Sequence, residues 1–175
     1  MSFIHKVWNW VESDFVLIAG LATSLKWVWE YSQGRKFEKN KFLLERIEKF
    51  NNLESTQKVQ KILDWNAITI EINGVNTKID DSILVESLKT HDQKVSFDST
   101  EVYIREIFDD YFTGLTELII LSKTGLVDEK NLKRFLQYWI DILNGRKQNK
   151  PENLINTIEN YLSFYRYEEV LNFLK

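Results

Sequence analysis

The run from Phe15 to Tyr31, FVLIAGLATSLKWVWEY, constrains the fold of this chain most, because it is suited to a solvent other than water. Its aromatic residues gather at the C-terminal end, and a basic patch formed by Arg35, Lys36, Lys39 and Lys41 follows directly. A bilayer core is crossed by about 17 to 25 helical residues, aromatic rings favour its interface, and Lys and Arg favour its cytoplasmic side. The run therefore predicts a membrane-spanning helix, with these span residues: Phe15, Leu17, Leu21, Leu25, Trp27, Trp29 and Tyr31.

Other positions for this helix stay open on the sequence alone. The run is at the short end of the spanning range, and Lys26 and Glu30 lie near its C-terminal end, where the Lys26 ammonium can extend to the headgroups. The same residues also suit a helix lying in the interface plane. A core helix of a soluble bundle is the remaining alternative. A cleaved signal peptide fits poorly, because Glu12 and Asp14 precede the run where a basic region is required.

The predicted span has two unlike faces. At about 100° per residue, small and polar residues fall on one side of the helix and large apolar residues fall on the other. Lipid offers polar groups no hydrogen-bonding partner, whereas a second helix does. The small and polar side therefore predicts a self-association stripe, formed by Gly20, Thr23, Lys26 and Glu30.

The distribution of basic residues predicts an orientation. The basic patch follows the run, and only Lys6 precedes it. The positive-inside rule then places the C-terminal part in the cytoplasm. We expect an N-terminal membrane anchor over residues 1–34, including an amphipathic lead segment, and a cytoplasmic helical domain over residues 35–175.

Composition limits the kinds of partner and chemistry. The net charge of -3 argues against a dedicated nucleic-acid binder, whose basic footprint would be broad. The absence of cysteine excludes disulfides, thiolate catalysis and Cys-ligated zinc. The partners we expect are therefore the lipid membrane and further copies of the chain, with no specific nucleic acid and with any other protein partner unidentified.

Periodicity after the basic patch predicts a mainly α fold, a helical bundle with one small β-hairpin. Alternating Ile68, Ile70 and Ile72, followed by Asn73-Gly74, predict the hairpin over about 68–79. Helical spacing, capping residues and helix-ending residues predict helices over about 35–50, 55–65, 80–89, 98–123 and 127–144, with a last helical region that begins at Pro151. Asp98 with Glu101 three residues later predicts a capping box at the start of the helix over 98–123, and Asn51 with Asn52 predicts the end of the helix over 35–50. The helix over 35–50 is placed so that it can continue the N-terminal one.

Side chains that could carry chemistry are few. The sequence contains no Walker loop, dinucleotide fingerprint, G-x-S-x-G or H-E-x-x-H motif, and its histidines are His5 and His91. Adjacent Asp109 and Asp110 point about 100° apart on a helix and do not converge. We therefore predict no catalytic, cofactor-binding or metal-binding residues and no cofactor.

One pocket was weighed against structural interpretations of the same residues. Trp65, at the junction between helix and hairpin, could line a ligand pocket with Arg105 and Asp109. The structural alternatives are a Trp65 that anchors the hairpin to the bundle and a salt-bridged helix face running through Glu101, Arg105 and Asp109. For the basic loop over 146–150, the structural interpretation is a solvated turn.

Four segments of the chain carry a family resemblance. They are FEKNKFLLERIEKFNN, VQKILDW, EVYIREIFDDYFTGLTEL and GLVDEKNLKRFLQYWI. They resemble an uncharacterised bacterial family of short proteins with one N-terminal transmembrane helix, a basic juxtamembrane helix and a cytoplasmic helical domain. The resemblance implies location and architecture, and no activity comes with it.

The sequence as a whole favours a non-enzymatic, membrane-anchored helical protein that self-assembles. It would act as a scaffold or as a pore-forming effector of the kind used in bacterial defence. The alternative from another functional class is a soluble, cytoplasmic regulatory or partner-binding helical domain in which residues 15–31 form a core helix. A third hypothesis, an enzyme that uses Trp65, Arg105 and Asp109, is the weakest, because these residues match no catalytic motif.

Overall fold

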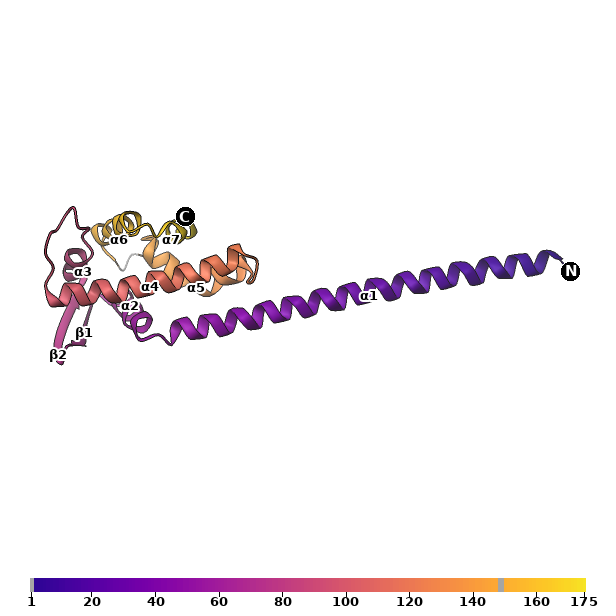
Figure 1. The fold of residues 1–175 in the computed structure, drawn as a ribbon, viewed down its shortest axis with the longest axis horizontal. Coiled ribbons are helices and arrows are strands. Elements are labelled where there is room, and N and C mark those ends of the chain that lie inside the picture. Colours follow the sequence, from indigo (N-terminus) through magenta and orange to yellow (C-terminus); the bar gives the residue numbers. More distant parts are fainter. Residues whose placement is uncertain (1, 148–149) are drawn as a thin grey trace. The chain divides into compact units, whose positions relative to one another are not determined.

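The computed structural model describes the backbone of residues 2–147 and 150–175 and the side chains of residues 26–147 and 150–175. These residues form two compact units, Met1–Lys41 and Phe42–Lys175, and each is described by itself. The predicted boundary between residues 34 and 35 stays a prediction. Over the described residues, the mainly α fold with one small hairpin is confirmed, since the chain forms seven helices and one two-stranded antiparallel hairpin (Figure 1). The membrane association of the N-terminal helix stays a prediction.

The first unit is helical. Helix α1 runs without interruption from Ser2 to Asn51, so the helix predicted over 35–50 continues the N-terminal one. From Phe42 onward α1 belongs to the second unit, where Leu43, Ile47 and Phe50 are buried at the i, i+4, i+7 spacing of one helix face.

No helix among the described residues is both long and apolar enough to cross a membrane. Most of the predicted span, residues 15–25, lies outside the residues whose side chains are described. The same holds for the span residues Phe15, Leu17, Leu21 and Leu25 and for two members of the predicted stripe, Gly20 and Thr23.

The hairpin follows a short helix in the second unit, which from here on is called the domain. Helix α2 spans Glu54–Asp64 and is followed by strands β1 (Ala67–Ile72) and β2 (Val75–Asp80). The strands pair from Ala67 with Asp80 to Ile72 with Val75. The two turn residues between them, Asn73 and Gly74, have φ values of 52° and 79°, as a type I′ turn requires, so the predicted hairpin is confirmed.

Capping side chains fix the starts of the next helices. Asp80 accepts hydrogen bonds from the backbone N–H groups of Ser82 and Ile83 at the start of α3, Asp81–Ser87. Asp98 and Glu101 form the predicted capping box of α4, Ser99–Lys123, with both reciprocal hydrogen bonds at 2.9 Å. Asp128 caps α5, Glu129–Leu143, by accepting one hydrogen bond from the Asn131 backbone N–H.

The last helical region, predicted to begin at Pro151, consists of two helices. Helix α6 spans Glu152–Phe164 and helix α7 spans Glu168–Leu174. Between them Arg166 has a φ of 60°, in the left-handed region that ends a helix. The helical periodicity continues across this point in the sequence, and the reversal at Arg166 carries no glycine to mark it.

Helix α4 organises the core of the domain. It contacts α2, α3, α5 and α7, as the salmon-coloured helix through the middle of the domain in Figure 1 illustrates. Its Phe108, Tyr111 and Phe112 are fully buried. The Phe50 ring lies so close to Gly114 of α4 that a Cβ there would approach it to 2.8 Å, so only glycine admits this contact.

Candidate functional site

The described part of the first unit carries an unusual set of exposed side chains. We call residues 26–41 the aromatic-basic segment. Its large rings are exposed: Trp27 by 68%, Trp29 by 63%, Tyr31 by 56% and Phe37 by 67%. A single helix has no interior of its own, so within this unit the rings have no apolar cover.

One face of the aromatic-basic segment is ordered by contacts one helical turn apart. The Trp27 and Tyr31 rings stack with centroids 5.9 Å apart and an interplanar angle of 11°. The Arg35 guanidinium carbon lies 5.8 Å from the centroid of the Tyr31 ring, on its face. Two rings and a cation therefore follow one another at i, i+4 and i+8, which is the spacing that brings helix side chains together.

The aromatic rings are not confined to that face. At about 100° per residue, Trp29 projects about 160° away from Tyr31 around the helix axis. The rings thus encircle the helix. A ring on every side is typical of a helix that passes through a membrane interface, whereas a helix lying flat in the interface has one apolar face.

The basic patch of the aromatic-basic segment has no acidic partner among the described residues. None of Arg35, Lys36, Lys39 and Lys41 forms an ion pair with a described residue. Within residues 26–41 the one ion pair described is Lys26–Glu30, at 3.8 Å with both side chains more than half exposed. Two members of the predicted stripe therefore lie close to each other along the same helix.

A second cluster of functional groups surrounds Arg105 in the domain. Arg105 Nη1 donates to the carbonyls of Ser87, at 2.9 Å, and Lys89, at 2.7 Å, and Nη2 donates to the Tyr165 hydroxyl at 2.6 Å. Its guanidinium carbon also lies 4.2 Å from the Phe97 ring centroid and 5.1 Å from that of Tyr161. Arg105 therefore fills an aromatic cage and satisfies the carbonyls at the end of α3.

Asp109 lies one turn further along α4 and also serves the fold. Its carboxylate accepts hydrogen bonds from the hydroxyls of Tyr161, at 2.8 Å, and Tyr167, at 3.0 Å. Burial, reinforced by the Asp109 charge, raises the pKa of the Tyr161 hydroxyl well above its usual range, and burial raises the pKa of Tyr167 to about 12. Both phenols are neutral donors to Asp109 at physiological pH.

The predicted salt-bridged face of α4 is wrong. Glu101 pairs with Lys94 rather than with Arg105, and Arg105 and Asp109 turn to carbonyls and tyrosines. The helical spacing is as expected. The partners differ because this face of α4 is covered by the α3–α4 loop and by α6 and α7, whose polar groups need the same side chains.

The three residues of the pocket considered in the sequence analysis, Trp65, Arg105 and Asp109, do not all lie together. Arg105 and Asp109 share Tyr161, whereas Trp65 shares none of their described hydrogen bonds or ring contacts. The Trp65 side chain is 62% exposed, so it is not the buried anchor of the structural alternative either. His91 is exposed and hydrogen-bonds to the Tyr165 hydroxyl at the edge of the aromatic cage.

Lys150 is the residue whose role sequence analysis missed. Its ammonium is fully buried and donates to the carbonyls of Ile62, at 3.0 Å, and Trp65, at 2.7 Å, and to the Asp81 carboxylate at 2.6 Å. The prediction of a solvated turn over 146–150 is therefore wrong for Lys150. No local signal distinguishes it from other lysines, because its partners lie up to 88 residues away.

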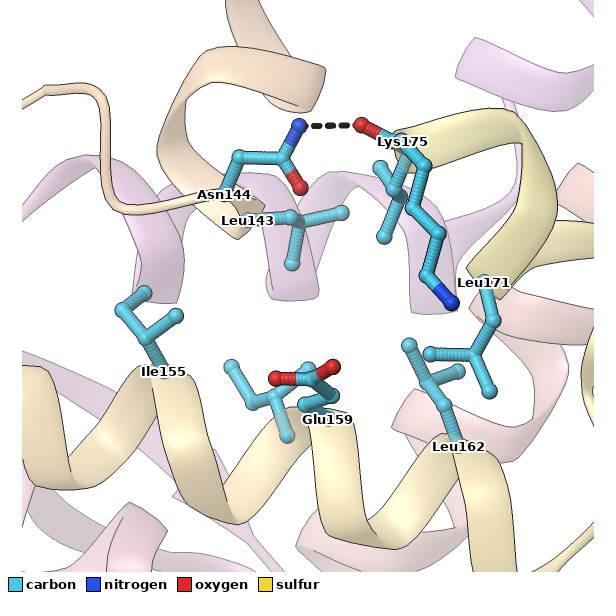
Figure 2. Close-up of a pocket in the computed structure, with 9 residues that line it drawn as sticks. Leu143, Asn144, Ile155, Glu159, Leu162, Leu171 and Lys175 are labelled. Atoms are coloured by element: carbon cyan, nitrogen blue, oxygen red, sulfur yellow. Dashed lines mark hydrogen bonds between the residues drawn. The ribbon is translucent and has the colours of Figure 1, made fainter.

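The domain also has a small cavity at the end of α5, lined by α6 and α7 (Figure 2). Its volume is about 110 Å³, and its walls are mostly Leu and Ile side chains. Glu159 and Lys175 lie on its lining without forming a described ion pair, and Asn144 donates to the Leu174 carbonyl beside it. Ligand sites usually measure about 300 to 1,000 Å³, so this cavity is too small for a typical substrate.

Among the described residues no three His, Asp or Glu side chains are grouped as metal ligands. No protein-family model, curated protein or solved structure matches the chain. The site that stands out is therefore the aromatic-basic segment, on its own geometry.

Proposed function

We propose that this chain is a non-enzymatic, membrane-associated helical protein that α1 holds at the lipid interface and that self-assembles there. The observation that carries the proposal is the belt of exposed rings formed by Trp27, Trp29 and Tyr31, followed after about one turn by cations that pair with no described residue. Moving one exposed aromatic ring out of water is worth about 1.5 to 3 kcal/mol. A membrane interface offers this gain to every ring of the belt at once.

Fractionation of cells expressing the full-length chain tests the membrane part of the proposal. We expect the chain to sediment with membranes and to resist carbonate extraction, while residues 37–175 alone stay in the supernatant. A full-length chain recovered without detergent as a soluble monomer would contradict the proposal and favour the alternative, a soluble regulatory or partner-binding domain with residues 15–31 as a core helix.

Orientation is tested separately. The basic residues that follow the belt favour a cytoplasmic domain. A reporter fused after Lys175 should be active if it needs the cytoplasm and inactive if it needs the periplasm. The opposite result would contradict this orientation while leaving membrane association intact.

The self-association part rests on the stripe formed by Gly20, Thr23, Lys26 and Glu30. Small and polar residues allow close helix approach, and interhelical hydrogen bonds contribute about 0.6 to 2 kcal/mol each. The double variant Thr23→Leu, Lys26→Leu should keep membrane retention and lose at least half of the crosslinked oligomers. If the assembly is a pore rather than a scaffold, the same variant also abolishes any ion leak on overexpression.

Val28→Leu is the matched control for the stripe. It adds apolar volume on the same helix, about 200° from Lys26 around the axis, and so leaves the stripe unchanged. Crosslinking of the double variant at the level of this control would contradict self-association through the stripe.

A further inference from the structure

We infer that the aromatic-basic segment selects membranes with anionic headgroups, through Arg35, Lys36 and Lys39. This inference rests on the proposed membrane association and names the chemistry of its partner. Three observations carry it: the cations are unpaired, they project from one side of the helix, and one of them is positioned by a ring of the belt.

The lack of acidic partners distinguishes these cations from some of the basic residues of the domain, although Lys61, Lys78 and Lys130 of the domain likewise form no described ion pair. Lys58, Lys94, Lys123 and Lys150 each pair with a carboxylate of the domain. The cations at 35–41 pair with no described residue, although Glu38 lies among them. Their charge is therefore available to an external anion.

The net charges of the two units point the same way. Residues 1–41 contain six basic and four acidic residues, which gives +2, and residues 42–175 contain 17 basic and 22 acidic residues, which gives -5. The sum is the net charge of -3 of the whole chain. Positive charge is concentrated beside the aromatic belt, where a membrane with anionic lipid is electrostatically complementary.

Geometry then orders the cations by their distance from the belt. Arg35 follows Tyr31 by four residues, about 6 Å along the helix, and its guanidinium is held over the Tyr31 ring. Arg35, Lys36 and Lys39 project within an arc of about 100°, whereas Lys41 lies on another side and about 15 Å beyond Tyr31. Salt screens charges over about 8 Å, so the contribution of each cation falls from Arg35 toward Lys41.

Vesicle partitioning of the full-length chain tests the inference. The probes are vesicles of phosphatidylcholine alone and vesicles with about 30% phosphatidylserine, at low and at high salt. We expect preferential binding to the anionic vesicles that high salt abolishes. Arg35→Gln should lower partitioning into anionic vesicles about fivefold, and Lys41→Gln about twofold or less. Arg35→Lys should preserve most of the binding because it keeps the charge.

The triple variant Arg35→Gln, Lys36→Gln, Lys39→Gln gives the largest expected effect, a loss of about 100-fold on anionic vesicles. Lys130 is an exposed lysine of α5, and Lys130→Gln removes one positive charge from the domain. This control should leave partitioning into the vesicles unchanged. Equal binding of the parent chain to neutral and anionic vesicles would overturn headgroup selection while membrane association stands. Binding to neither kind of vesicle would overturn both.

Discussion

Arginine and lysine side chains have different kinds of partner in the domain and in the aromatic-basic segment. In the domain Arg105 donates to two carbonyls and a hydroxyl, and Lys150 donates to two carbonyls and a carboxylate. In the segment Arg35 lies on an exposed tyrosine, and its lysine neighbours form no described ion pair. The domain thus supplies partners for its buried Arg105 and Lys150, whereas the segment presents exposed rings and a basic patch that forms no described ion pair.

The largest expected effect is the destabilisation of the domain by Lys150→Met. It removes a fully buried ammonium and leaves the carbonyls of Ile62 and Trp65 and the Asp81 carboxylate without their donor. Breaking a buried ion pair in this manner costs about 3 to 5 kcal/mol. We expect the free energy of unfolding, measured by guanidinium denaturation of the full chain, to fall by about 3 kcal/mol.

The control for Lys150→Met is the same substitution in the other region. Lys39→Met should leave the free energy of unfolding of the domain within about 0.5 kcal/mol, since surface changes away from special contacts have small effects. Equal effects of the two substitutions would break the contrast between the regions.

Asp98→Ala should have an intermediate effect. It removes the side chain that accepts from the Glu101 backbone N–H and so destroys the capping box at the start of α4. Loss of such a cap costs about 1 kcal/mol. Asp98→Asn is the conservative comparison, because asparagine also caps helices well, and thermal unfolding should rank it between Asp98→Ala and the parent chain.

The smallest effect concerns alkaline pH. Since folding raises the pKa of Tyr167 to about 12 and that of Tyr161 further, the unfolded chain loses these protons first, at its ordinary pKa of 10. The stabilising effect of both tyrosines is therefore complete below about pH 10 and declines between about pH 10 and 12. Tyr167→Phe should make this decline shallower in denaturation curves recorded across that range. An unchanged slope would contradict the assignment to Tyr167.

Local signals in the sequence were sufficient for most of the fold. Alternating isoleucines with Asn73-Gly74 gave the hairpin within one residue at each end. Asp98 with Glu101 gave the capping box of α4, and the asparagine at position 51 gave the end of α1. These features depend on residues a few positions apart, which is the range over which caps, turns and periodicity act.

The partners of the charged side chains could not be predicted from the sequence. The ladder predicted through Glu101, Arg105 and Asp109 has the correct spacing and the wrong contacts, and Lys150 gave no signal at all. The break at Arg166 within the predicted last helical region carries no glycine to mark it, although its φ lies in the left-handed region.

The sequence by itself determined the helices, the hairpin and the order of rings and cations along α1, because each is set by neighbours within about one or two helical turns. Tertiary structure alone decided which carbonyls Arg105 and Lys150 satisfy. The Trp65 carbonyl and the Lys150 ammonium are 85 residues apart in the chain and 2.7 Å apart in the fold. A buried donor binds whichever acceptors the packed helices leave unpaired, and that set exists only once the helices have packed.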